Sequence, residues 1–392
     1  MKMRHAAIAL VLALALGACD SSTSSPPSVT NTQALQTWAA SVTDLSLPGD
    51  SNFAPSSVSA AMKEKWDSVV NLQRFKTEAN ADLARILADW ASRNPVVSAW
   101  TEVNSTDTMV TGVNGWMKLV RFTVDGVSQG GLAWVPKASG SHPVILVGHP
   151  GDQGVTATLA ATFGALMGAA RLNNTILLFP AYRGETAYML NDSVAGDPAT
   201  ASPWDRDVDD GLAMLQASLD RMPGADASRI VAFGFSRGAG VSLIAALRDK
   251  RIKAVFEIAG PTDFLAPSIQ LLAFQLAGGG TVDLPGVNYI SGRYVMPYWN
   301  GAIPADSIRT ALLRRSVARM ARSGLLPTTQ AIHGSADVTV YPEQTRHLAL
   351  ADARVDTLFV PGMTHTSWFS APVEQMTIGS RLQTFLQANL GN

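Results

Sequence analysis

The chain has 392 residues, of which 47% are hydrophobic and 16% are charged, so a sizeable core is expected and disorder is not. Its length suits one large α/β domain with an extension, or two domains. The formal net charge of -1 indicates neither nucleic-acid binding nor a strongly charged substrate. No apolar run after residue 20 is long enough to cross a membrane.

Residues 1–19 predict an export signal rather than part of the fold. Lys2 and Arg4 give a basic start, and residues 6–16 form a short apolar run. The sequence Leu-Gly-Ala-Cys that ends at Cys19 resembles the lipobox of bacterial lipoproteins, which implies acylation of Cys19 and removal of the residues before it. We therefore expect an exported protein that a lipid anchors in the bacterial cell envelope, on the periplasmic or cell-surface side. An ordinary secretory signal is the alternative.

Two segments separate this signal from the main domain. Residues 20–52 begin with a run rich in Ser, Thr and Pro that buries little apolar surface, which predicts a flexible tether. Residues 53–105 predict a helical extension, because apolar side chains recur there at helical spacing. The clearest set is Leu83, Ile86, Leu87 and Trp90. We expect the extension to pack on the main domain; binding of a partner is the alternative.

Residues 106–392 have the pattern of an α/β domain. Two β-rich stretches separated by turn residues predict an antiparallel start. Strands are expected at 143–149, 175–182, 229–235, 253–260, 328–334 and 355–362, and helices at 155–171, 205–221, 240–249, 342–352 and 373–389. This alternation predicts a mainly parallel sheet with helices on both faces, in which ligands bind at the carboxyl ends of the strands.

The stretch RIVAFGFSRGAG at 229–240 places a strand directly before a helix. Between them Gly234, Ser236 and Gly238 have the spacing G-x-S-x-G, which is typical of a tight turn that exposes a serine hydroxyl above a sheet. Small residues suit that turn because a Cβ atom would clash there. Glycine and serine are common, so the pattern predicts a nucleophile only if the chain also supplies a base, an acid and oxyanion donors.

Chain order in this architecture places the acid and the base after the nucleophile. His365 is the expected general base because it follows a strand at the active edge of the sheet. His347 lies in a helical run, where a solvent-exposed histidine is expected. The expected acid is Asp337, which also follows a strand and would orient the imidazole; Asp263, after an earlier strand, is the alternative.

An oxyanion in a tetrahedral intermediate needs backbone N–H donors. We expect one from Arg237, the residue after the nucleophile. The other is expected from Gly151, in the loop after the first parallel strand, because Pro150 has no N–H. His149 in the same loop has a side chain that can bind a metal, but no second cluster of His, Cys or Asp supports a metal site. The sequence therefore predicts neither a metal nor a cofactor.

With these pieces in this order, the chain resembles the α/β-hydrolase superfamily, and within it the catalytic domains of prolyl oligopeptidase (S9) type. The stretches that carry the resemblance are GHPGDQ at 148–153, PAYRGETAY at 180–188, the elbow, IAGPTDF at 258–264 and the region around Asp337. It covers about residues 106–392 and implies the α/β-hydrolase fold with a Ser-His-Asp mechanism. Pro150 and Arg237 depart from the Gly and Tyr that are common in that group. The residues before 106 are too few for the propeller of true oligopeptidases, so esterase and peptidase activities both stay open.

Residues 264–322 form a longer connection than a simple loop and predict a lid or a pocket wall. Tyr294, Tyr298 and Trp299 are candidates for lining an acyl or ring pocket; packing is the alternative. Arginines near the end of this insertion are expected to form a solvent-exposed basic face: Arg309, Arg314, Arg315, Arg319 and Arg322. Arg183 and Glu185, in the stretch YRGE, are expected to form a structural ion pair.

Taken together, the residues predict a serine hydrolase that cleaves an ester or a peptide or amide bond through Ser236, Asp337 and His365, with an acyl-enzyme and no cofactor. The expected partners are a small ester or a short peptide as substrate and a membrane through the lipid on Cys19, with no nucleic acid. The alternative is a non-catalytic lipoprotein that uses the fold as a binding or structural module.

Overall fold

The computed structural model describes residues 30–50, 58–93 and 95–391, so Cys19 and the predicted signal lie outside the described residues. Within them a nine-stranded sheet has the order β1-β2-β3-β6-β4-β9-β10-β11-β12. Its strands are β1 (Val97–Val110), β2 (Val113–Val124), β3 (Val127–Pro136), β4 (His142–Gly148), β6 (Ile176–Pro180), β9 (Ala225–Phe235), β10 (Ile252–Ile258), β11 (Thr328–Gly334) and β12 (Val355–Val360). The pairs from β1 to β6 are antiparallel and those from β6 to β12 are parallel. The predicted mainly parallel α/β fold with an antiparallel start is confirmed.

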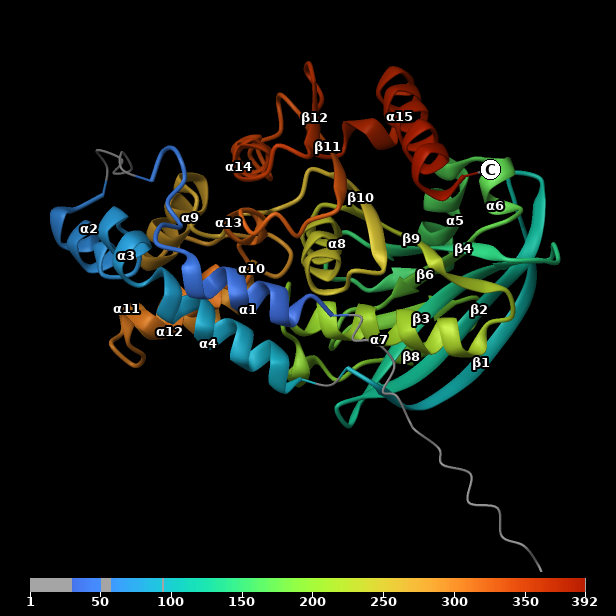
Figure 1. Ribbon diagram of the computed structural model, residues 1–392, viewed down its shortest axis with the longest axis horizontal. Helices are drawn as coiled ribbons and strands as arrows, with labels where there is room; N and C mark the ends of the chain where they lie inside the picture. Colours follow the sequence, from blue (N-terminus) through green and yellow to red (C-terminus); the bar gives the residue numbers. More distant parts are fainter. Residues whose placement is uncertain (1–29, 51–57, 94, 392) are drawn as a thin grey trace, which may run out of the picture.

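Helices cover both faces of this sheet (Figure 1). On one face lie α5 (Ala157–Met167), α6 (Ala169–Leu172) and α15 (Pro372–Leu390), and on the other α7 (Arg206–Arg221), α8 (Arg237–Arg248), α13 (Val317–Ala321) and α14 (Glu343–Ala351). Every residue of β4 is buried, because a central strand covered on both faces has no polar side. In the sheet Phe233 pairs with Val147 and with Phe256, so the carboxyl ends of β4, β9 and β10 lie at one edge.

A second, three-stranded sheet packs beside β3. It consists of β5 (Val155–Thr156), β7 (Thr186–Met189) and β8 (Asp192–Ala195), and the short helix η1 (Pro198–Thr200) follows it. Strands this short show no clear period-two alternation, which is why the sequence did not predict them. The sheet bears on the site because β5 follows the loop that contains Gly151.

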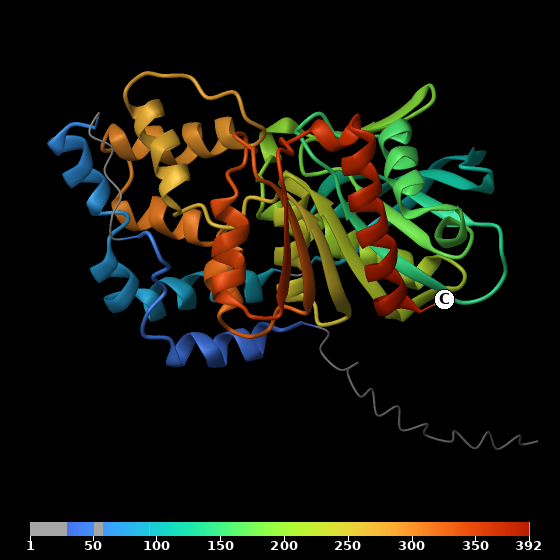
Figure 2. The same ribbon diagram turned by 90° about the horizontal axis from the view of Figure 1, so that it is seen from above.

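The helices before the sheet lie beside the insertion between β10 and β11. The N-terminal helices are α1 (Thr32–Ser41), α2 (Ala60–Asp67), α3 (Leu72–Thr77) and α4 (Ala79–Ser92); the insertion forms α9 (Pro267–Ala277), α10 (Val287–Ile290), the π-helix η2 (Ser291–Val295), α11 (Met296–Trp299) and α12 (Ala305–Leu313). Figures 1 and 2 show the blue N-terminal helices and the orange insertion together at one end of the molecule. We call this assembly, residues 32–50 and 58–92 together with 264–322, the helical layer.

Two predicted boundaries are wrong. Residues 32–41, inside the predicted tether, form helix α1, because Leu35 and Ala39 are buried in the same core as α4. Residues 97–105, inside the predicted helical extension, belong to β1, which pairs with β2 along its length. Strand β1 is exposed at most of its positions, so its sequence lacks the apolar run by which the other strands were found.

The predicted solvent-exposed arginine face is wrong for three of its five members, whereas Arg322 is exposed. Arg309, Arg315 and Arg319 are fully buried. Arg309 Nε donates to Asp82 Oδ2 on α4 at 2.5 Å, and Arg319 pairs with Asp50 at 2.8 Å. A buried guanidinium is tolerated only when carboxylates and carbonyls satisfy it. Arg309 and Arg319 therefore join the insertion to the N-terminal segment.

Candidate active site

Ser236 lies at the junction of β9 and α8 in a strained backbone conformation, with φ 54° and ψ -124°. The glycines around it are required by close packing. A Cβ on Gly238 would lie 2.1 Å from the carbonyl carbon of Gly148, and a Cβ on Gly234 would lie 2.3 Å from the oxygen of Gly238. Helix α8 thus approaches β4 so closely that only glycine fits, and this approach lifts the Ser236 side chain above the edge of the sheet.

The structure brings together the three residues predicted as nucleophile, base and acid. Ser236 Oγ lies 2.9 Å from His365 Nε2, and His365 Nδ1 lies 2.7 Å from Asp337 Oδ2. Asp337 follows β11, and His365 follows β12, just before the short helix η3 (Ser367–Phe369). The imidazole is therefore bound on one side to a hydroxyl and on the other to a carboxylate.

The surroundings of Asp337 keep its carboxyl ionised. Burial by itself would raise its pKa, but contacts from His333 and His365 and a backbone bond outweigh burial and hold the pKa well below its usual range. Oδ1 accepts from the N–H groups of Thr339 and Val340 at 2.9 and 3.0 Å. A carboxylate held from the backbone in this way has one orientation toward the imidazole.

A buried polar chain lies behind Asp337, and the sequence analysis missed it. Glu257 Oε1 lies 3.4 Å from Thr345 Oγ1, Thr345 Oγ1 lies 2.7 Å from His333 Nδ1, and His333 Nε2 lies 3.5 Å from Asp337 Oδ2. Burial raises the pKa of Glu257 to about 7, against the attraction of His333. The stretch TTQAIHG carries no signal for this chain beyond a histidine in a predicted strand, because the partners of His333 come from β10 and α14.

The two residues that are expected to supply oxyanion donors are joined by a hydrogen bond. Arg237 is the first residue of α8, so its backbone N–H has no acceptor within that helix. Gly151 has a φ of 77°, which favours glycine, and its carbonyl accepts a 3.1 Å hydrogen bond from Arg237 Nη1. The side chain of Arg237 thus ties the Gly151 loop to the elbow, a contact that the sequence analysis did not foresee.

Arg237 is the centre of a buried ion cluster. Its guanidinium contacts Glu185 Oε1 at 2.5 Å and Asp207 Oδ2 at 2.8 Å, and it lies over the ring of Tyr182, 4.4 Å from its centre. Glu185 Oε2 in turn accepts from the Gly154 N–H at 3.1 Å. Burial raises the pKa of Glu185 to about 7, while Arg237 opposes this rise.

The expected ion pair between Arg183 and Glu185 is not formed. Arg183 instead pairs with Asp210 on α7 at 2.5 Å. Residues two apart lie on the same side of an extended segment. Here the chain turns between Arg183 and Glu185, at Gly184 with a φ of 86°, so the two side chains point in different directions. His149 stacks on Tyr182 with ring centres 3.9 Å apart, and burial lowers its pKa to about 3.

The alternative acid and the second histidine form a pair of their own, away from Ser236. His347 Nδ1 lies 2.9 Å from Asp263 Oδ2, and the same carboxylate pairs with Arg319 at 2.9 Å. His347 is 4% exposed, so the expectation of a solvent-exposed histidine is wrong. Its ring faces the insertion because α14 packs against α13.

A cavity of about 60 Å³ opens at Ser236. Its wall includes Trp204, Phe264, Leu272 and Val340. The three aromatic residues expected there do not line it. Tyr298 and Trp299 pack on Trp66 of α2, with ring centres 6.3 and 6.0 Å away, and Tyr294 packs on Tyr289 and Arg315. The packing alternative therefore describes them, because the N-terminal helices cover the side of the insertion on which they lie.

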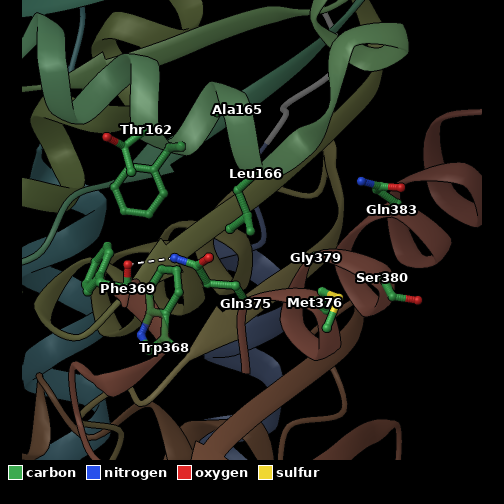
Figure 3. A pocket seen from close by; sticks show the side chains of 11 residues that line it. Thr162, Ala165, Leu166, Trp368, Phe369, Gln375, Met376, Gly379, Ser380 and Gln383 are labelled. Carbon is green, nitrogen blue, oxygen red and sulfur yellow. Dashed lines mark hydrogen bonds between the residues drawn. The ribbon is translucent and has the colours of Figure 1, made fainter. Parts of the chain in front are cut away.

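A larger cavity, of about 650 Å³, lies between α5 and α15 (Figure 3). Its wall includes Leu166, Trp368, Phe369 and Met376, and Gln375 Nε2 donates to the Phe369 carbonyl at 2.6 Å. None of the three residues joined at Ser236 lines it. Phe235 lies between the two regions, with its ring centre 5.1 Å from those of both His365 and Trp368.

The described residues contain no group of three or more His, Cys, Asp or Glu side chains that could hold a metal ion. Among the helices that the structure describes, none has both the length and the apolar character needed to cross a membrane.

No protein-family model matches the chain, and no curated protein matches it in sequence. Solved structures do resemble it. A puromycin-hydrolyzing peptidase from Mycobacterium tuberculosis superposes with a TM-score of 0.50 at 18% identity, over 72% of this chain and 40% of that one. The acylaminoacyl peptidase of Pyrococcus horikoshii gives 0.51 at 15% identity, over 71% and 42% of the two chains. Acetyl xylan esterase 1 from a Thermoanaerobacterium species gives 0.51 at 16% identity, over 78% and 94%.

These similarities show the fold. The chain has the α/β-hydrolase fold found in S9-type catalytic domains, as the sequence predicted. It spans about two-fifths of the length of the two peptidases and most of the length of the esterase. At such low identity the relatives assign no residue of this chain a role, so the chemistry rests on the geometry around Ser236.

Proposed function

We propose that this chain is a serine hydrolase that cleaves an ester or amide bond through an acyl-enzyme formed on Ser236. One observation carries the proposal: the His365 ring lies within hydrogen-bond distance of both Ser236 Oγ, at 2.9 Å, and Asp337 Oδ2, at 2.7 Å. A nucleophile, a base and a group that orients the base are the minimum that such chemistry needs.

The geometry supports a definite sequence of proton transfers. Nε2 of His365 accepts the Ser236 proton as Oγ attacks the carbonyl carbon, and it then gives that proton to the leaving group. Asp337 fixes the tautomer with the proton on Nδ1 and stabilises the imidazolium, because its own pKa is held low. The N–H groups of Arg237 and Gly151 are the proposed donors to the oxyanion. Water then cleaves the acyl-enzyme by the same route, without a cofactor.

The fold is compatible with both esters and peptides as substrates. Structures of similar fold include enzymes described as a puromycin-hydrolyzing peptidase, an acylaminoacyl peptidase and an acetyl xylan esterase. We propose a small ester or amide substrate, since the cavity at Ser236 is narrow.

Covalent labelling tests the proposal. A fluorophosphonate probe should label the protein, and Ser236→Ala should abolish labelling and lower hydrolysis of p-nitrophenyl esters or aminoacyl anilides by at least about 10³-fold. Ser380→Ala, on the exposed side of α15, is the matched control and should behave as wild type. A wild-type protein that neither reacts with the probe nor hydrolyses any of these substrates would contradict the proposal.

We also propose that the chain is exported and lipid-anchored at Cys19 in the bacterial cell envelope. The support is the sequence alone: a basic start, a short apolar run and a lipobox-like Leu-Gly-Ala-Cys. Metabolic labelling with a palmitate analogue should mark the wild type and not Cys19→Ser. Equal labelling of the two proteins would contradict anchoring at this residue.

A further inference from the structure

The cavity at Ser236 is apolar on nearly all sides. Among the described residues that line it, Arg237 is the only one with a charged side chain, and Glu185 and Asp207 already hold its guanidinium. Apolar side chains from the insertion supply the wall farthest from the elbow: Ile269, Leu272, Leu284 and Val287. Polar side chains such as Ser268 and Tyr341 make up only a small part of the wall, so a charged or sugar-like group entering here would lose most of its hydration.

A second cavity, of about 40 Å³, continues the first into the helical layer. The two share four lining residues: Phe264, Ile269, Leu272 and Val287. The second is closed at its far end by Trp66 of α2 and Leu312 of α12. Its exposed wall is apolar throughout. We call the first cavity the serine chamber and the second the deep chamber.

One face of helix α9 forms the common wall. Ile269, Leu272, Ala273 and Leu276 follow the spacing i, i+3, i+4 and i+7, which places them along one side of the helix. Ile269 and Leu272 line both chambers, while Ala273 and Leu276 line only the deep one. The side chains that line both chambers, Phe264 among them, therefore lie between the two spaces.

We propose that the two chambers together bind the unbranched aliphatic acyl chain of the substrate, with its carbonyl at Ser236 and its methyl end toward Trp66. This proposal rests on the proposed function and narrows it to esters of medium-chain fatty acids. A cavity whose exposed wall is apolar suits a chain that ends in a methyl group, because that group needs no hydrogen-bond partner.

The volumes set the expected chain length. A water-sized group, which is close to the size of a methylene, needs about 15 Å³ of such space, so the serine chamber holds about four groups and the deep chamber about three. A butanoyl chain thus fits the serine chamber alone, whereas an octanoyl chain reaches the deep chamber. Each buried methylene should raise kcat/KM about threefold to fourfold.

The test compares p-nitrophenyl acetate, butanoate, octanoate and dodecanoate in the wild type and in two variants. Ala273→Leu fills the deep chamber only. Ala277→Leu makes the same change on the same helix at a residue that lines neither chamber, and it serves as the matched control. We expect wild-type kcat/KM to rise from acetate to octanoate. Ala273→Leu should exclude about three groups of the octanoyl chain, and thus lower octanoate hydrolysis about 30-fold, while butanoate is unchanged. Ala277→Leu should follow the wild type.

An enlarging variant tests the same idea in the opposite direction. Leu276→Ala should move the preferred chain length toward dodecanoate, which a misfolded protein would not do. A flat wild-type profile from acetate to octanoate, or an equal effect of Ala273→Leu on all four esters, would overturn the acyl-chain proposal.

Labelling with a short-chain alkyl fluorophosphonate separates the two levels of failure. If the probe labels Ser236 but ester chain length has no effect, the acyl-chain proposal is wrong and the proposed function stands. If the probe fails to label Ser236 and no ester is hydrolysed, the proposed function is wrong and the acyl-chain proposal falls with it.

Discussion

Two aspartate–histidine pairs in this protein are nearly identical in geometry and differ in use. Asp337 and His365 lie 2.7 Å apart at the edge of the sheet, and Asp263 and His347 lie 2.9 Å apart against the helical layer. In both pairs the pKa of the carboxyl is lowered although burial opposes it. What differs is the third group: the first pair meets the hydroxyl of Ser236, and the second meets the guanidinium of Arg319.

The comparison teaches that the third group decides the chemistry of such a pair. His365 Nε2 lies 2.9 Å from a hydroxyl, with which it exchanges a proton in the mechanism that we propose. In the second pair burial opposes the charged form of His347, but the Asp263 carboxylate outweighs it and raises the pKa of the histidine, so a network of fixed charges results. That network joins α14, the insertion and the N-terminal segment through Asp50. One pair is suited to reaction and the other to holding parts together.

Changing each aspartate in turn tests most directly whether the two pairs differ in function. Asp337→Asn should lower kcat about 10⁴-fold with little loss of stability, because the amide keeps its backbone contacts but favours the wrong imidazole tautomer. Asp263→Asn should keep kcat within a few fold and lower the melting temperature. Steady-state kinetics and thermal unfolding on both variants decide it. Loss of activity in Asp263→Asn alone would reverse the assignment of the acid.

Removing Arg319 should test the structural pair. Arg319→Met leaves Asp50 and Asp263 buried without their cation, and we expect the free energy of unfolding to fall by about 3–5 kcal/mol. Arg381→Met, which breaks an exposed pair with Asp356, should cost less than about 1 kcal/mol. Urea denaturation followed by circular dichroism measures both. Equal losses would mean that the buried network does not hold the helical layer.

A smaller effect is expected at Arg237, which follows Ser236 and is also the centre of the buried ion cluster. Arg237→Lys keeps the charge but loses the planar fork, so it can no longer hold Glu185, Asp207 and the Gly151 carbonyl together. We expect kcat to fall about 10- to 100-fold with KM for a short ester little changed. Arg248→Lys, the same change at a buried pair on the same helix, should leave kcat unaltered. A rise in KM alone would show that Arg237 acts on substrate binding instead.

The smallest effect concerns the pH dependence of stability. The folded-state pKa of Glu257 is raised from 4.5 to about 7, so its contribution to stability is fully present below pH 4.5 and is lost as the pH rises through 7. Between these values the slope approaches about 1.4 kcal/mol per pH unit. Glu257→Gln removes this titration, so its free energy of unfolding relative to wild type should increase between pH 5 and pH 8. Urea denaturation at both pH values measures the difference, and parallel curves would contradict the prediction.

The candidate triad could be predicted from the sequence because each member follows a strand. In this architecture the nucleophile, the acid and the base also occur in a fixed order along the chain. Gly234, Ser236 and Gly238 are adjacent in sequence, and the loops of Asp337 and His365 follow apolar runs that could be recognised without a structure. In a parallel sheet the carboxyl ends of such runs meet at one edge. The lipid anchor on Cys19 stays a prediction.

The errors concern contacts made over long distances in the chain. Arg309 and Arg319 were expected in solvent because a run of arginines has no local sign of burial; their carboxylate partners Asp82 and Asp50 lie far away in sequence. Tyr298 was expected at the cavity because the insertion is rich in aromatic residues, which suit a pocket wall. Instead it packs on Trp66 of α2. The contact between the Arg237 side chain and the Gly151 carbonyl was not predicted either, because the two residues lie far apart in the sequence.

The sequence by itself determined the elements whose cause is local: the alternation of strands and helices, the glycine elbow, and the loops that deliver Asp337 and His365. Only the tertiary structure decided which buried charges pair, which aromatic rings pack, and that the serine chamber shares part of its wall with a second cavity lined by Trp66. Periodicity and turn chemistry act over a few residues and can be read along the chain. Burial and ion pairing depend on which distant segments the fold brings together.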